Sequence, residues 1–169
     1  CASHTVTSVI VMDEIKTPPK NLTPPEPFTV TVEALSGPTL TLKVVALVVN
    51  KAPFWLVSTK NITINTPADF KGKKIVTYLK PSTAWALTVK LGSEGGLVEG
   101  KNFTIIQSQF GSELGPLFSG QADASLTLPP TVQQAVAQGA KIVYSYPEAF
   151  GDMAVTGLTT TEEYIQNNP

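Results

Sequence analysis

The chain has 169 residues, of which 42% are hydrophobic and 15% charged, and its formal net charge is −1. This length is enough for one domain with a real core but not for two large ones, and the near-neutral charge argues against a nucleic-acid partner. All 12 basic residues are lysine, so an anion would have to be held by lysine, hydroxyls or helix N-termini rather than by a guanidinium fork.

The single cysteine and the single histidine, Cys1 and His4, both lie at the start of the chain. A metal site needs three or four ligands, so we expect none, and a terminus holds a nucleophile pair poorly. Cys1 fits either the lipid-modified first residue of a mature lipoprotein or the start of a fragment. The sequence contains no apolar run of about 18 residues and no signal peptide, so we expect no membrane span.

Residues 1–39 are predicted to form an irregular, β- and proline-rich N-terminal segment. Residues 17–27 contain five prolines, which exclude a helix or a central strand. A strand is possible at 7–12, and the alternation of apolar and polar side chains at 28–34 predicts another. A longer strand is expected at 39–49 after a Gly-Pro turn, so these last two strands should form a hairpin.

From residue 50 onward, predicted strands and helices alternate with short connections. Glycines end the helical stripes, and prolines or capping residues begin them. Such repeated units predict an α/β fold with a mainly parallel sheet flanked by helices. The strands are expected at 53–57, 74–78, 104–107, 124–127, 142–145 and 154–158, and the helices around 84–91, 114–118, 132–136 and after 160.

The stretch 66–88 joins a short capped turn, a strand and a loop that opens into a helix. Asp69 can complement the N-terminus of the first turn, and Ser82 and Thr83 open the later helix. Open α/β sheets place ligands at such a point, where unpaired N–H groups and two hydroxyls favour an anion or a polar oxygen. The other interpretation is an ordinary strand-to-helix connection with a Ser/Thr cap.

Several loose motifs follow one another along the chain. They are residues 43–57, residues 69–75 with a Pro-Ser-Thr loop at 81–83, the Gly-x-x-Asp-Ala helix end at 120–124, the strand-to-helix return at 128–131 and the helix end at 137–141. In this order they resemble periplasmic solute-binding proteins of the nitrate/sulfonate/taurine type, whose superfamily includes binding proteins for thiamine-pyrimidine precursors. The resemblance covers residues 40–169.

The resemblance implies a lobe of the periplasmic-binding-protein type II fold, in which crossover strands join two such lobes. Strands of a first lobe do not appear in residues 1–40, so we expect a fragment, a truncated relative or an incomplete sequence. The expected divisions are an extended segment at 1–39, crossover strands at 40–65, the ligand-binding lobe at 66–158 and the start of a returning helix at 159–169.

The resemblance also implies a ligand site at the helix N-termini and at the loops that follow the strands. Hydroxyls and backbone N–H groups would hold an oxyanion or polar head group, and aromatic side chains would form walls for an apolar part. Trp85 can equally be a core side chain of its helix, and Asp123 is expected to be structural. The expected ligand-binding residues are Tyr78, Ser82, Thr83, Trp85, Phe110, Thr127 and Pro129.

We therefore expect an extracytoplasmic solute-binding protein, or part of one, that presents a small polar or anionic organic solute to a membrane ABC permease. It would carry out no chemistry and need no cofactor, and it would lie in the periplasm or outside the cell, free or lipid-anchored through Cys1. Because the chain lacks arginine, the site should prefer a ligand satisfied by hydroxyls and backbone amides to a multiply charged phosphate.

Two other classes of protein stay open. A structural or assembly protein of the cell exterior could reuse the fold as a single lobe, with a homo-oligomer supplying the missing surface. The sequons at Asn21, Asn61 and Asn102 would be glycosylation sites in a compartment that modifies asparagine, but sequons arise by chance in a threonine-rich chain, and this second interpretation is favoured. An enzyme resembling the thiamine-pyrimidine synthase would depend on a cysteine-rich motif and a histidine, and this chain has no cysteine after position 1 and no histidine after position 4.

Overall fold

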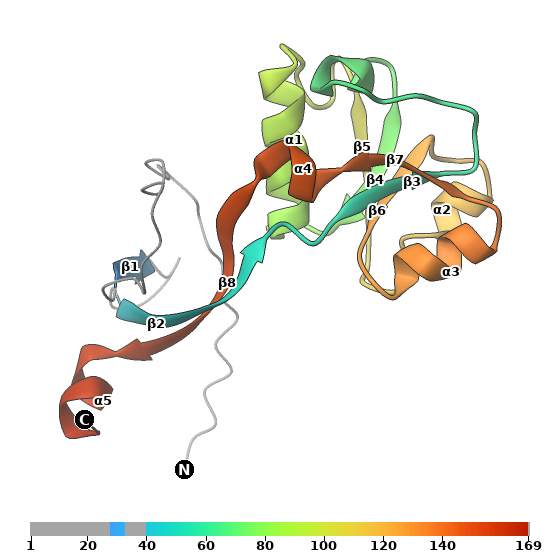
Figure 1. The fold of residues 1–169 in the computed structure, drawn as a ribbon. Coiled ribbons are helices and arrows are strands. Elements are labelled where there is room, and N and C mark those ends of the chain that lie inside the picture. Colours follow the sequence, from blue (N-terminus) through green and yellow to red (C-terminus); the bar gives the residue numbers. More distant parts are fainter. Residues whose placement is uncertain (1–27, 33–39, 169) are drawn as a thin grey trace. The chain divides into compact units, whose positions relative to one another are not determined.

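The computed structural model describes residues 28–32 and 40–168 (Figure 1). Contacts divide the chain into two compact units, one made of Cys1–Asn50 and Met153–Pro169 and the other of Lys51–Asp152. The chain therefore passes between the units twice, at residues 50–51 and 152–153. The candidate strand at 7–12 lies outside the described residues.

The first unit contains a three-stranded sheet in the order β1-β2-β8. Strand β1 (Phe28–Val32) pairs with β2 (Leu40–Lys51) in antiparallel register, with Phe28 opposite Val44, so the pairing expected of a hairpin is confirmed. Strand β8 (Asp152–Thr161) leads into helix α5 (Glu162–Asn167), where the Thr161 hydroxyl accepts from Tyr164 N at 3.2 Å. A helix is thus present within the predicted 159–169, but it begins at Glu162 with Thr161 as the capping residue, because residues 159–161 still belong to β8.

The second unit is built on a five-stranded sheet in the order β5-β4-β6-β3-β7. Strand β4 is parallel to both β5 and β6, whereas β3 is antiparallel to β6 and β7. The prediction of an α/β fold is confirmed, with one antiparallel strand inserted. No crossover helix precedes β3, so the right-handed crossover rule does not fix its direction. The strands are β3 (Trp55–Ser58), β4 (Lys74–Tyr78), β5 (Thr104–Ser108), β6 (Ala124–Thr127) and β7 (Lys141–Ser145).

Helices cover both faces of this sheet, with α1 on one face and α2 and α3 on the other (Figure 1). Helix α1 (Thr83–Glu94) buries Ala84, Leu87 and Leu91, which recur at the helical period and so form one apolar stripe. Helix α2 (Gly115–Phe118) is a single turn, and α3 (Thr131–Ala137) is two turns long. A 3-10 turn, η1 (Pro67–Phe70), precedes β4, and α4 (Tyr146–Phe150) follows β7.

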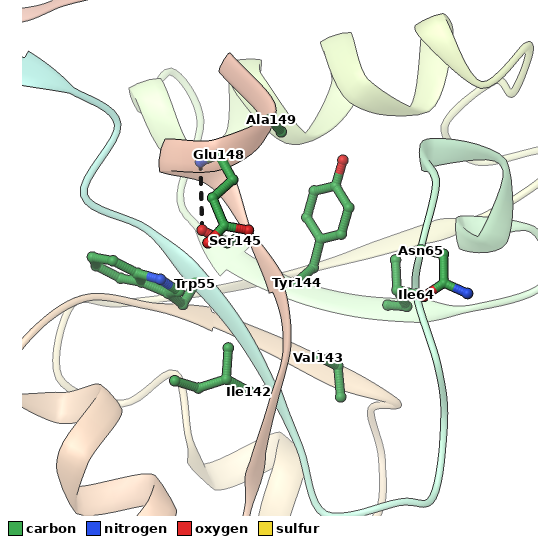
Figure 2. A pocket seen from close by; sticks show the side chains of 9 residues that line it. All are labelled: Trp55, Ile64, Asn65, Ile142, Val143, Tyr144, Ser145, Glu148 and Ala149. Carbon is green, nitrogen blue, oxygen red and sulfur yellow. Dashed lines mark hydrogen bonds between the residues drawn. The ribbon is translucent and has the colours of Figure 1, made fainter. Parts of the chain in front are cut away.

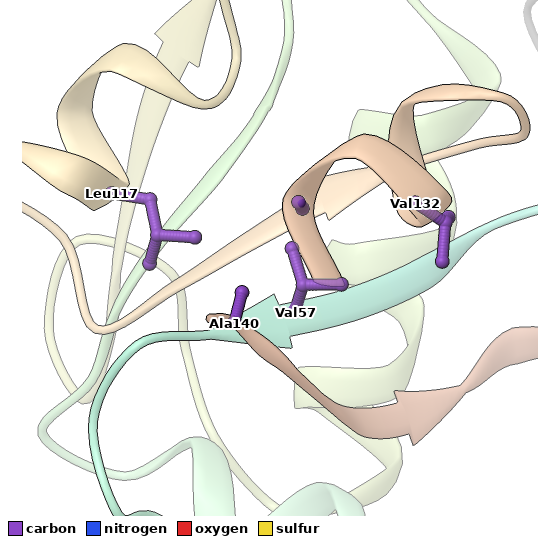
Figure 3. Packing of buried hydrophobic residues seen from close by; sticks show 5 residues of the cluster. Val57, Leu117, Val132 and Ala140 are labelled. Carbon is purple, nitrogen blue, oxygen red and sulfur yellow. The ribbon is translucent and has the colours of Figure 1, made fainter. Parts of the chain in front are cut away.

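The two faces of the sheet have different cores. On the α2 and α3 face, small aliphatic side chains pack together: Val57, Leu117, Val132, Ala135 and Ala140 (Figure 3). On the α1 face the core is aromatic, and Tyr146 and Phe70 are fully buried. Adjacent rings there meet at centroid distances of 5.9–6.5 Å, mostly edge to face, which suits their quadrupoles.

Candidate functional site

Three parallel strands end side by side at one edge of the second unit's sheet. Tyr78 ends β4 and pairs in register with Ser108, which ends β5, while Thr127 ends β6. Because parallel strands carry their carboxyl ends to the same edge, the loops that follow all begin there. We call the carboxyl ends of β4, β5 and β6, together with the loops that follow them, the carboxyl edge. Most of the candidate site residues predicted from the sequence lie there.

Glu113 joins two of these strand ends. Its Oε1 accepts a hydrogen bond from the Tyr78 hydroxyl at 3.1 Å and another from the Thr127 hydroxyl at 2.9 Å. The Ser125 hydroxyl donates to the backbone oxygen of Glu113 at 2.7 Å, which fixes the loop against β6. The Glu113 carboxyl group therefore ties β4 to β6 through one oxygen.

The network around Glu113 is buried. Glu113 is 1% exposed, Thr127 is 0% exposed and Tyr78 is 9% exposed. Burial raises the pKa of the Tyr78 hydroxyl, and the nearby charge of Glu113 raises it further, so Tyr78 stays a hydrogen-bond donor at neutral pH. The second carboxyl oxygen, Glu113 Oε2, is also buried, and no donor among the described residues reaches it.

An exposed aromatic side chain borders the network. The ring of Phe110 lies 5.3 Å from the ring of Tyr78, yet 71% of Phe110 is exposed. Leu79, next to Tyr78, is 48% exposed. Large apolar side chains on a protein surface beside a buried polar group are typical of the rim of a ligand site.

The N-terminus of α1 opens at the same edge. The Ser82 hydroxyl accepts from Trp85 N at 3.2 Å, and Ala86 N donates to Ser82 O at 3.0 Å. The N–H groups of Thr83 and Ala84 come before this first intrahelical bond, in the part of a helix that favours an anion or a polar oxygen. The Ser82 side chain is thus a capping group, and the backbone N–H groups are the donors that a ligand could use.

Trp85 is partly buried in the first turn of α1. The ammonium group of Lys80 lies 4.4 Å from its ring centroid, a cation–π contact. The indole Nε1 is buried, and no acceptor among the described residues reaches it. Within the described residues, the buried side-chain atoms without a partner are Trp85 Nε1 and Glu113 Oε2, and both belong to segments that follow the carboxyl ends of parallel strands.

The structure brings some of the predicted residues together and leaves others apart. Tyr78, Phe110 and Thr127 meet through shared contacts with each other or with Glu113, and Ser82, Thr83 and Trp85 share the first turn of α1. Pro129 is exposed in the loop after β6 and shares no described contact with the others. As expected, Asp123 is structural, because its Oδ2 accepts from Lys74 N at 2.8 Å.

Glu113 is the residue that the sequence analysis missed. It lies in Phe110-Gly-Ser-Glu-Leu-Gly, a short loop between β5 and α2 with no other charge. In a chain with only 15% charged residues, a lone carboxyl group in a loop after a strand is the signal that could have identified it.

A separate groove of about 650 Å³ runs beside edge strand β7, and none of the predicted site residues lines it (Figure 2). Figure 2 shows Trp55 and Glu148 near one end and Ile64 and Asn65 at the other, with the Ser145 hydroxyl accepting from Glu148 N. The groove is open, and no buried polar atom of its lining lacks a partner. We therefore place the candidate site at the carboxyl edge around Tyr78 and Glu113.

The described residues, 28–32 and 40–168, contain no group of three or more histidine, cysteine, aspartate or glutamate side chains that could hold a metal ion. In the same residues no helix is both long and apolar enough to cross a membrane.

Comparisons with known proteins give one family and one fold. A family model described as NMT1/THI5 like matches residues 29–169. The periplasmic aliphatic sulphonate binding protein SsuA from Escherichia coli is similar in structure with a TM-score of 0.62 at 19% identity, over 75% of this chain and 41% of that chain. The alkanesulfonate-binding protein SsuA from Xanthomonas axonopodis pv. citri, bound to MOPS, gives a TM-score of 0.57 at 21% identity, over 75% and 43%. No curated protein matches the sequence.

A third solved structure, an ancestral arginine-binding protein bound to arginine, gives a TM-score of 0.50 at 22% identity, over 69% of this chain and 50% of that chain. These likenesses confirm the predicted fold, a lobe of the periplasmic-binding-protein type II kind. The aligned part of the chain covers less than half the length of the two sulfonate-binding proteins.

Proposed function

The chain belongs to the NMT1/THI5-like family, and from this we propose that it is an extracytoplasmic solute-binding protein, or the ligand-binding lobe of one. In this proposal it captures a small polar or anionic organic solute and passes it to a membrane ABC permease. Binding involves no chemical step, so the residues at the site have to recognise the solute and release it.

One observation carries the proposal. Tyr78 at the end of β4 contacts Glu113 and Phe110 from the loop after β5, and α1 begins five residues after Tyr78. Open α/β sheets bind ligands at the carboxyl ends of their strands. An exposed aromatic ring beside a buried carboxyl oxygen without a partner is the combination expected of a small-molecule site.

The α1 start suits the head group of such a solute. Thr83 and Ala84 offer backbone N–H groups at the positive end of a helix that is 12 residues long, and Lys80 adds a cation next to Trp85. The donors are amides and one ammonium group rather than a guanidinium fork, so a singly charged or neutral polar head group should bind better than a phosphate dianion.

The test uses the two tryptophans of the chain as reporters. Trp85 lies in the proposed site, and Trp55 lines the groove beside β7, so ¹H–¹⁵N spectra of the labelled protein should show two indole N–H signals. We expect short alkanesulfonates or carboxylates to shift the Trp85 signal in a saturable way. Trp85→Phe and Trp55→Phe assign the two signals.

Three results would count against the proposal. A saturable shift of the Trp55 signal alone would place binding in the groove beside β7. Stabilisation by inorganic phosphate and phosphate esters only would contradict the expected head group. Saturation of neither signal by nitrate, sulfonates, carboxylates or pyrimidines would contradict solute binding by this chain.

The same proposal assigns roles to the segments. Residues 66–158 would form the ligand-binding lobe, residues 40–65 the crossover strands and residues 159–169 the start of a returning helix, with residues 1–39 as the N-terminal segment. The protein would work in the periplasm or outside the cell, with Cys1 as the point of lipid attachment if it is anchored.

A further inference from the structure

Glu113 is set apart from the other carboxyl groups of the described chain. It is 1% exposed, whereas the carboxylates in ion pairs with Lys51, Lys60 and Lys90 keep contact with solvent. None of the ion pairs in the described residues includes Glu113. Carboxyl groups are rarely fully buried without a cationic partner.

The two oxygens of Glu113 have different surroundings. Oε1 receives both the Tyr78 and the Thr127 hydroxyls, so this oxygen is fully used within the protein. Oε2 is as deeply buried but receives nothing from the described residues. A carboxyl oxygen that is buried without a donor is costly, and the cost is removed when a donor arrives.

The structural carboxylate Asp123 has a partner at each of its two oxygens. Asp123 Oδ1 accepts from the Lys60 ammonium at 2.6 Å, and its Oδ2 accepts from Lys74 N at 2.8 Å. Asp69 Oδ2 accepts from both Asn65 N and Thr66 N, and this side chain is only partly buried, so solvent can reach the carboxyl group. The free oxygen of Glu113 is therefore an exception, and it lies at the edge of the sheet where the solute is proposed to bind.

Resting on the proposed function, we infer that the solute carries an amino or ammonium group whose N–H donates to Glu113 Oε2, and that Glu113 selects solutes on this group. Tyr78 and Thr127 hold the carboxyl group from the other side and leave Oε2 as its free acceptor. A positively charged donor also supplies the cation that Glu113 lacks.

This assignment describes a solute with two different ends. The amides of Thr83 and Ala84 at the start of α1 suit an acceptor or an anionic group, and Glu113 suits a donor. Phe110 offers an apolar surface, since its ring is 71% exposed. Because Glu113 itself is covered, a neighbouring side chain must move for the amino group to reach it. Phe110 belongs to the same loop and has little packing to lose.

The experiment compares solutes that differ in one group. We would titrate the protein with 2-aminoethanesulfonate, 2-hydroxyethanesulfonate and ethanesulfonate, and with 3-aminopropanoate and propanoate, following the Trp85 indole signal. The amino compound should bind about tenfold or more tightly than its alkyl counterpart in at least one series, the difference expected for a hydrogen bond to a charged group. The trimethylammonium analogue of the same amino compound keeps the positive charge but has no N–H, so it should lose most of this gain in affinity.

The matched variants are Glu113→Gln and Glu148→Gln. Glu113→Gln keeps an oxygen for Tyr78 and Thr127 but presents an NH₂ group in place of Oε2, so the preference for the amino compound should fall to about threefold or less. Glu148 is exposed and lines the groove beside β7, so Glu148→Gln should keep the preference. If Glu113→Gln does not fold, the solute comparison on the unchanged protein still decides.

The possible failures are distinguishable. If sulfonates or carboxylates bind without regard to the amino group, the inference about Glu113 is wrong while the proposed function stands. Loss of the preference in Glu148→Gln instead, or full binding of the trimethylammonium analogue, also overturns it. If none of these compounds binds saturably and nitrate and pyrimidines also fail to bind, the proposed function itself is overturned; binding of nitrate or pyrimidines alone would overturn only the inference about Glu113.

Discussion

The two ends of strands β4 and β6 are each bridged by a carboxyl group, and the two bridges differ in completeness. At the amino end, Asp123 binds the backbone N–H of Lys74 and the ammonium group of Lys60, so both oxygens have partners. At the carboxyl end, Glu113 binds Tyr78 and Thr127 through one oxygen and leaves the other without a donor among the described residues. The carboxyl group at the amino end of these strands therefore has a partner for each oxygen, whereas the one at the carboxyl end has a partner for only one.

The difference between these two carboxyl groups assigns stability to one end of the strands and ligand binding to the other. The partly buried, fully paired carboxylate of Asp123 holds strands together, and it does so at the end of the strands where α/β sheets do not bind ligands. The buried, half-paired carboxyl group weakens the folded state when nothing else is bound, which is a cost typical of functional sites. Substitutions at the amino end should therefore lower the stability of the fold, and substitutions at the carboxyl end should weaken solute binding.

The largest effect on stability is expected from Asp123→Ala. This change leaves the N–H of Lys74 without its acceptor and removes the ion pair with Lys60, so the free energy of unfolding should fall by about 1–3 kcal/mol. Solute affinity should stay within about twofold, because Asp123 lies at the opposite end of the strands. Urea denaturation followed by circular dichroism gives the first quantity, and titration of the Trp85 signal gives the second.

The same variant has a pH signature. Burial acts to raise the pKa of Asp123, but hydrogen bonds from Lys60 and from the Lys74 N–H outweigh it, so the pKa lies below the ordinary value of 3.8. A lowered folded-state pKa stabilises the protein above the unfolded-state pKa, and this stabilisation is lost as the pH falls through the folded-state value. The stability gap between wild type and Asp123→Ala should therefore narrow below about pH 4. A gap that stays constant down to pH 3 would contradict this account of Asp123.

A smaller effect distinguishes two buried tyrosines, Tyr78 and Tyr146, whose rings both contact Phe54. The Tyr146 hydroxyl is 2.8 Å from the Thr88 hydroxyl, which also donates to Ala84 O, so this pair is closed within the core. Tyr146→Phe and Tyr78→Phe should each cost about 0.5–1.5 kcal/mol of stability. Only Tyr78→Phe should weaken binding of the amino-bearing probe, by severalfold, because it releases one of the two groups that hold Glu113.

Equal effects on binding would remove the distinction between these two tyrosines. If Tyr146→Phe weakened solute binding as much as Tyr78→Phe does, changes in the packing of the aromatic core would be altering the affinity of the site. The contact between Tyr78 and Glu113 would then have no special role in binding. Melting curves of both variants are the control, since they show whether a loss of binding follows a loss of folded protein.

The sequence predicted the elements better than it predicted the site. Strands such as β4 and the helical stripe of α1 follow directly from their local pattern, because a two-residue or 3.6-residue period needs no knowledge of the neighbours. The antiparallel direction of β3 was not predicted, since strand pairing depends on contacts between distant segments. Helix α4 was also missed, because its five residues, starting at Tyr146 after the Ser145 cap, are too few to show a period.

At the site, residue type alone identified the polar and aromatic candidates but not their partners. Tyr78 and Thr127 were predicted as ligand contacts, whereas their hydroxyls donate to Glu113. Their partner lies 35 residues from Tyr78 and 14 from Thr127, a separation at which sequence patterns carry no information on contact. Whether the seven predicted residues contact a solute stays a prediction for the titrations above.

The smallest effect on stability is expected at the rim of the site. Phe110 is 71% exposed, so Phe110→Ala should change the free energy of unfolding by less than about 0.5 kcal/mol. The same change removes the apolar surface beside Tyr78, so solutes with an alkyl or aryl part should bind several times more weakly, while nitrate, which has no such part, should be unaffected.

Phe118→Ala in α2 is the matched control, since Phe118 is also an exposed aromatic side chain, at 39%, and shares no described contact with the Glu113 network. A stability loss above about 2 kcal/mol in Phe110→Ala would identify the ring as core packing instead, and the carboxyl edge would then lose its apolar wall.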